Sequence, residues 1–114
     1  MINYHRELVA ALETILPTYY ELMITADTKT PCISYQERNN SIDTIGDTVG
    51  YSRISYTVKV WGNDLATIQE YAQAVDNTLR PLGWRRISSG ELFDINSTMK
   101  QKILTYEGLA MEVF

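Results

Sequence analysis

The sequence has few of the residues on which most catalytic and metal-binding proteins depend. Cys32 is the single cysteine and His5 the single histidine among 114 residues. One cysteine excludes a disulfide within the chain and fits folding in a reducing cytoplasm. One histidine falls short of the imidazole sets that are common in zinc sites. We therefore interpret Cys32 as a small buried hydrophobic residue and His5 as a solvated polar one, while a nucleophile pair formed by the two in space stays open.

An excess of positive charge and a long hydrophobic run are also missing. The formal net charge is -4 and the isoelectric point is about 4.9, whereas nucleic-acid binding needs a basic face. The doublet Arg85 and Arg86 would point to opposite faces of a strand, so it forms no patch by itself. No run approaches the roughly 18 apolar residues of a membrane span, and the start of the chain is unlike a signal peptide. We expect a soluble chain made in the cytoplasm, without nucleic-acid or membrane partners.

Catalytic and cofactor motifs are absent as well. There is no glycine-rich phosphate loop with lysine, no GxSxG and no dinucleotide fingerprint. The stretch DTIGDTVG, from Asp43 to Gly50, has the composition of a calcium loop, but Ile45 and Val49 occupy ligand positions and no closing glutamate follows. We expect no catalytic residue, no metal site and no cofactor. The rival hypothesis is a small metal-dependent hydrolase or ligand-binding domain that uses Glu37, Asp43 and Asp47.

The residues that are present predict one folded domain spanning 1–114. Hydrophobic residues make up 45% of the chain and charged residues 21%, which is ordinary for a globular domain of this size. Apolar residues at helical spacing predict a helix over about 3–16, ended by Pro17, and a second helix of about seventeen residues after the capping sequence GND. The apolar stripe of the second helix comprises Leu65, Ile68, Ala72, Val75 and Leu79.

Alternating and β-rich segments predict the strands. The clearest is YSRISYTVKVWG, in which one face holds Ile54, Tyr56, Val58 and Val60. The other predicted strands cover 18–24, 31–37, 84–87 and roughly 101–113. Two amphipathic helices and a sheet with one apolar face predict an α+β two-layer sandwich, with a mostly antiparallel sheet and both helices on one face, in the order α-β-β-loop-β-α-β-β.

Residues 38–52, RNNSIDTIGDTVGYS, interrupt this regular pattern. An irregular loop of this length is unusual inside a compact domain and is commonly functional or disordered. Because it joins two neighbouring strands, we expect it to project from one end of the sheet and to become ordered against a partner. Trp61 follows the strand alternation onto the polar face, where it is a candidate interface anchor; alternatively, it folds over the sheet edge onto the second helix.

Several longer phrases occur in the same order as in a known family. They are ALETILPTYYEL, TPCISYQERNN, GYSRISYTVKVWGND, IQEYAQAVDNTLRPLGW, RRISSGELFD and KILTYEGLAMEVF. Together they span nearly the whole chain, which resembles the tail terminator (tail completion) proteins of long-tailed bacteriophages and prophages. The resemblance rests on overall pattern and not on a catalytic motif.

This resemblance implies an assembly role. Family members form a hexameric ring on the tail tube, stop its growth and provide the surface that joins tail to head. The implied partners are other copies of the chain, the tail tube protein and a neck or head-completion protein. The implied location is the virion, at the tail-neck junction. Related neck and head-closure connectors have similar size and acidity and are the alternative within this class. The expected contact residues are Asn39, Asn40, Asp43, Ile45, Asp47, Val49, Tyr51, Arg53 and Trp61.

Overall fold

The computed structural model describes residues 5–25, 28–44, 49–93 and 99–113. For residues 5, 22, 39–44, 49–52, 91–93 and 109–113 it describes the backbone only. The elements follow one another as α1 (His5–Glu13), β1 (Thr18–Tyr20), the 3-10 turn η1 (Glu21–Met23), β2 (Cys32–Thr44), β3 (Val49–Gly62), α2 (Leu65–Leu79), the 3-10 turn η2 (Arg80–Leu82), β4 (Arg85–Phe93) and β5 (Lys100–Val113).

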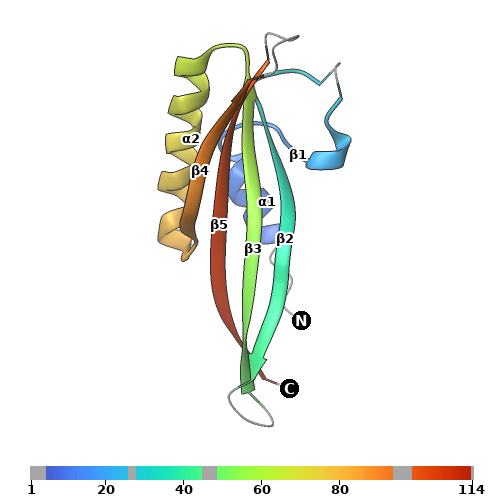
Figure 1. The fold of residues 1–114 in the computed structure, drawn as a ribbon, viewed down its shortest axis with the longest axis vertical. Helices are drawn as coiled ribbons and strands as arrows, with labels where there is room; N and C mark the ends of the chain where they lie inside the picture. The colour runs from blue at the N-terminus through green and yellow to red at the C-terminus, as the bar shows by residue number, and fades with distance from the viewer. Residues whose placement is uncertain (1–4, 26–27, 45–48, 94–98, 114) are drawn as a thin grey trace.

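The strands form one mixed sheet with both helices on the same face. Its order is β1-β2-β3-β5-β4; β1 runs parallel to β2, and every other neighbouring pair is antiparallel. Figure 1 shows α1 behind the sheet, and α1 and α2 contribute to one buried cluster with it. The α+β class predicted from the sequence is confirmed.

The core lies between the helices and the alternating apolar face of β3. Ile54, Tyr56, Val58 and Val60 are at most 1% exposed, as the period of two predicts. Opposite them lie the apolar stripes of the two helices, with Leu8 and Leu12 from α1 and the buried residues Ile68, Ala72, Val75 and Leu79 from α2. Each helix therefore buries the face that its sequence spacing indicated.

Local sequence sets both ends of α2. Asp64 is the N-cap: its carboxylate accepts hydrogen bonds from the Ala66 backbone N–H and the Thr67 hydroxyl. Pro81 lies in η2, and Gly83 follows with φ of 97°, a left-handed conformation that favours glycine. This turn reverses the chain from α2 into β4.

Two predicted elements have different extents in the structure. The strand expected over 18–24 ends at Tyr20, and the chain continues as η1. The strand expected over 84–87 continues to Phe93, through Ser88, Ser89 and Gly90, which the sequence placed in a turn. Pairing with β5 supplies the hydrogen bonds of this segment, so its weak intrinsic strand preference does not decide its conformation.

The prediction of an irregular loop over 38–52 is wrong for most of its length. The backbone of β2 continues to Thr44 and that of β3 begins at Val49, so only 45–48 lie outside the described residues. These strands and the end of β5 extend past both helices in Figure 1, as a narrow three-stranded projection. We call residues 39–44, 49–52 and 109–113 the arm. Of the helices that the structure describes, none is long and apolar enough to cross a membrane.

Candidate functional site

The face of the sheet turned away from the helices, here called the outer face, is only partly open to water. Sequence alternation predicted a wetted face, yet Ser34 is fully buried there and Thr57 is 6% exposed. Glu21 forms an ion pair with Lys59, which attaches η1 to this face of the sheet. Ser34 is itself in contact with the indole of Trp61.

Trp61 lies on the outer face, as predicted. Its indole Nε1 donates a hydrogen bond to Ser34 Oγ at 2.9 Å, and Lys59 Nζ lies 5.9 Å from the centre of its ring. These contacts come from β2 and β3 and not from α2, so the alternative in which Trp61 folds over the edge onto α2 is wrong. The half-buried ring has a fixed orientation, which is favourable for a contact residue.

Most of the other predicted contact residues are positions of the arm. The register pairs Asp43 with Tyr51 and Arg53 with Leu109. Because strand positions alternate, most of the expected contact residues share the outer face by register: Asn39, Asp43, Val49, Tyr51, Arg53 and Trp61. Asn40 pairs with Ile54 and so falls on the helix side. Arg53 is exposed, while Ile45 and Asp47 lie outside the described residues.

The carboxylates of the rival metal-site hypothesis are not brought together within the described part of the chain. Glu37 and Asp43 belong to the same strand, six positions apart, which corresponds to about 20 Å of extended backbone. Ligands of one cation have to lie within about 2.5 Å of it. Among the described residues, no group of three or more His, Cys, Asp or Glu side chains could hold a metal ion.

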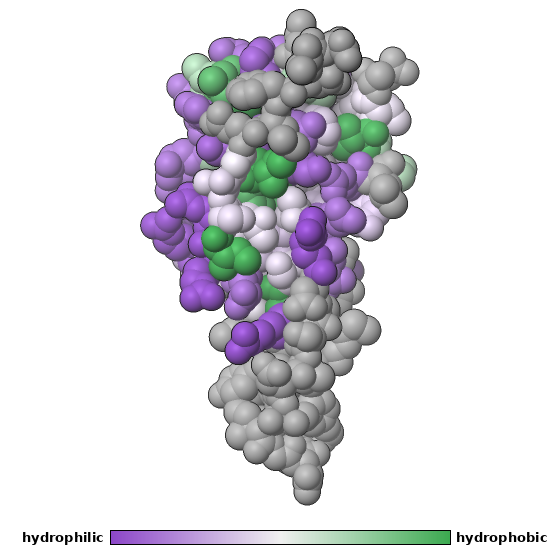
Figure 2. Space-filling view, viewed as in Figure 1, coloured by the Kyte–Doolittle hydropathy of each residue, from purple (hydrophilic) through white to green (hydrophobic). Residues whose placement is uncertain are grey.

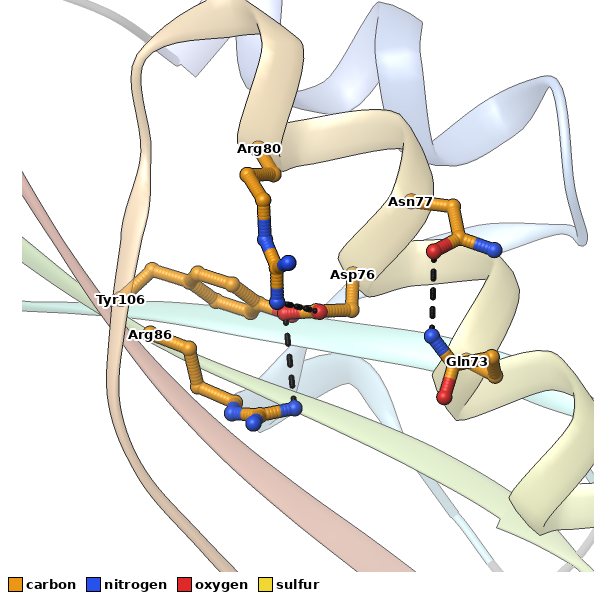
Figure 3. A network of polar contacts seen from close by, with 6 residues as sticks. All are labelled: Gln73, Asp76, Asn77, Arg80, Arg86 and Tyr106. Atoms are coloured by element: carbon orange, nitrogen blue, oxygen red, sulfur yellow. Dashed lines mark hydrogen bonds and ion pairs between the residues drawn. The ribbon is translucent and has the colours of Figure 1, made fainter.

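A buried carboxylate that sequence analysis missed lies on the helix side of the sheet. Asp76 of α2 is 2% exposed. Tyr106 of β5 donates its hydroxyl to Asp76 Oδ1 at 3.1 Å, and Arg80 donates to Oδ2 at 2.5 Å. Arg86 of β4 lies 3.5 Å from Oδ1. Figure 3 shows the three side chains converging on this carboxylate, which joins α2 to both β4 and β5.

Burial and charge govern the hydroxyl of Tyr106. Burial raises the pKa of this phenol above its ordinary value of 10.0, and the negative charge and hydrogen bond of Asp76 raise it further. The neutral phenol is therefore the form that donates to the carboxylate. The sequence did hold a signal for this pair, because Asp76 falls between Ala72 and Leu79 at intervals of four and three, on the apolar stripe itself.

The turn between α2 and β4 concentrates positive charge. Arg80 and Arg85 have side chains that are 69% and 75% exposed, and no aspartate or glutamate occurs from Asn77 to Gly90. Arg85 lies 3.6 Å from Glu107 on the outer face, whereas Arg86 reaches Asp76 on the helix side. The predicted opposite orientation of the doublet is confirmed. Even so, Arg80, Arg85 and Arg86 all line one surface pocket of about 320 Å³, together with Gly83 and Trp84.

The surface over the outer face is mixed in polarity. Figure 2 shows purple and near-white areas with small, separate green areas over the coloured part of this face. Such a surface is typical of contacts that combine polar groups with a few apolar anchors. Tyr19, Tyr20 and Ile87 are among the larger hydrophobic residues that are exposed on the described surface.

The comparisons with known proteins support the fold. A scan against protein-family models found no match, and a search of curated proteins found none either. Among solved structures, the chain is similar to one from a structure titled "Virion of native gene transfer agent (GTA) particle". The TM-score is 0.61 at 15% sequence identity, over 93% of this chain and 83% of that one. At this identity the similarity is one of fold.

Proposed function

We propose that this chain is a structural protein of a phage-like virion and, more specifically, a tail terminator. In this role it forms a hexameric ring on the tail tube, ends tail growth and presents the surface for a neck or head-completion protein. The observation that carries the proposal is the similarity of fold, over 93% of the chain, to a chain of a gene transfer agent virion. The sequence resemblance to tail terminators supports the more specific role at the end of the tail tube.

The shape of the molecule supports an assembly role. The longest dimension is 52 Å against 25 and 22 Å for the others, because the arm extends past the helix-covered core. An extended element that projects from a small domain can contact a neighbouring subunit without rearrangement of the core. We propose that the arm, with Arg53 and Trp61 on the same face, makes subunit contacts, and that the role is not catalytic.

Tail length measured by negative-stain electron microscopy tests the role. Virion production from a gene set that lacks this chain should yield overlong tubes and tails without heads, and the wild-type chain should restore both length and joining. Tails of normal length that fail to join heads would instead identify a neck connector. Complete virions without the chain would refute both roles.

A shortened arm tests where the contacts lie. Asn40 and Ile54 are paired, so residues 41–53 can be replaced by the two-residue turn Asn-Gly, which favours a tight hairpin. We expect this variant to remain folded, with normal helix content by circular dichroism, but not to restore tail length. The matched control is Asn77→Ala on an exposed position of α2, which should restore it fully. A shortened variant that restores normal tails would contradict the proposed arm contacts.

A further inference from the structure

At each edge of the sheet, part of the strand backbone is not paired with another strand among the described residues. On one side, β1 pairs with β2 only from Ile33 to Tyr35, so β2 from Gln36 to Thr44 has no strand on the side away from β3. On the other side, β4 pairs only with β5. The open stretch of β2 has the same length as the nine-residue β4. Open edges of this kind pair readily with another strand.

The two edges run in opposite directions. β4 is antiparallel to β5, and β5 and β2 are both antiparallel to β3, so β4 runs opposite to β2. A second copy, turned about an axis along the strands, would therefore present its β2 antiparallel to this β4. Because the two edges differ, the contact is head-to-tail and can close into a ring.

We propose that β4 of one copy pairs, antiparallel, with residues 36–44 of β2 in the next copy, so that the sheet continues from subunit to subunit. This inference rests on the proposed ring and names its interface. The occupant of each edge is a second copy of this chain. The pairing would satisfy backbone groups on both edges with one repeated contact.

One register is favoured by the faces and the lengths of the two strands. Ser88 pairs with Thr105 and Ser41 with Arg53, and both positions fall on the outer face. Placing Ser88 opposite Ser41 therefore keeps each position on its own face. This register also overlaps all nine residues of β4 with all nine residues of the open stretch 36–44, whereas shifted registers leave part of both edges without a strand partner.

The resulting stagger is compatible with a closed ring. Through the sheet register, Ser88 lies level with Thr57 of β3, and Ser41 lies level with Arg53 of β3. These two levels are four residues apart, so pairing Ser88 with Ser41 shifts adjacent copies by about 13 Å along the strands. The four strands from β2 to β4 span about 19 Å across the sheet. Together these displacements tilt the strands by roughly 35° from the ring axis, as in closed barrels.

Engineered disulfides between copies test the register. Directly opposite positions of an antiparallel pair lie within disulfide distance, and the native Cys32 is buried. The full chain with Ser41→Cys and Ser88→Cys should give a ladder of cross-linked oligomers under mild oxidation, both in concentrated solution and on isolated tails. The matched control, Ser41→Cys with Ser89→Cys, places the second thiol on the other face and should cross-link several-fold less.

Mixing the two single-cysteine variants tests whether β4 pairs with β2 or with another β4. A mixture of Ser41→Cys and Ser88→Cys chains should stop at cross-linked dimers, whereas dimers of Ser88→Cys alone would show β4 pairing with β4 and would overturn the proposal.

Different outcomes would overturn the edge pairing alone or the terminator role as well. Rings on tail ends, seen by electron microscopy, without cross-links between positions 41 and 88 would overturn the edge pairing and leave the terminator role standing. Complete virions produced without the chain, together with no rings and no ladder from the double-cysteine variant, would overturn both.

Discussion

The indole ring of Trp84 packs directly against Gly108. A Cβ atom added at Gly108 would lie 3.0 Å from Trp84 Cζ3 and 3.1 Å from Cε3. Trp84 also meets Tyr56 edge to face, with ring centres 5.6 Å apart. Gly108 pairs with Ile54, the core residue nearest to the arm. Trp84 therefore covers the end of the core at the point where the arm begins.

The first prediction concerns this contact. Gly108→Ala should lower the free energy of unfolding by about 1–3 kcal/mol, because the added methyl group displaces a packed aromatic ring. Urea denaturation measures the change. Gly90→Ala is the matched control: it lies in an exposed strand with nothing within 4 Å of the added Cβ, so it should leave the stability unchanged or slightly higher. Equal effects of both substitutions would contradict the packing argument.

The second prediction concerns Asp76. Asp76→Ala leaves the buried Tyr106 hydroxyl without its acceptor, and we expect a loss of roughly 2 kcal/mol in the free energy of unfolding. The exposed Arg80 contributes little to this figure, because solvent screens its ion pair. Asp76→Asn keeps an acceptor oxygen and should cost less. The hypothesis is contradicted if the two variants unfold at the same urea concentration.

The third prediction concerns alkaline pH. Burial is the main cause that raises the pKa values of Tyr56 and Tyr106 above 10.0, with nearby negative charge adding to it. A folded-state pKa above the unfolded value contributes stability below pH 10, and this stability is lost as the pH rises through and beyond 10. Unfolding experiments at pH 8 and pH 11 should show lower stability at the higher pH. Absorbance at 295 nm should show these two phenols ionising only as the chain unfolds.

The fourth prediction concerns the thiol of Cys32. The side chain is fully buried, and burial raises its pKa, so both access and the thiolate fraction are low. Ellman's reagent should react with the native chain very slowly at pH 8 and rapidly in denaturant. A Ser88→Cys chain supplies the comparison, because position 88 is exposed and its thiol should react at once. Rapid labelling of Cys32 in the folded wild-type chain would contradict its assignment as a core residue.

The sequence predicted the elements whose periodicity matches their burial. Both helices and β3 follow this rule, because one face of each is apolar and that face enters the core. Residues 38–44 and Ser88 to Gly90 do not follow it, since they are polar or small and form strands through pairing with distant segments. Their conformation depends on tertiary hydrogen bonds, which local composition does not encode.

The candidate site was predictable to a similar degree. Strand alternation placed Trp61 on the outer face, and the structure adds its bond to Ser34. The attachment of η1 to that face depends on the ion pair between Glu21 and Lys59, which are far apart in the sequence, so local patterns did not predict it. The open edges required the strand order, because sequence alone did not indicate that β5 would enter between β3 and β4.

The opposite orientation of Arg85 and Arg86 has a mechanical consequence for β4. One side chain is held to Glu107 on the outer face and the next to Asp76 of α2 on the other. Two attachments on opposite sides of a strand resist rotation of that strand about its own axis, as well as its separation from β5. Tension applied to this edge would therefore be shared between the sheet and α2.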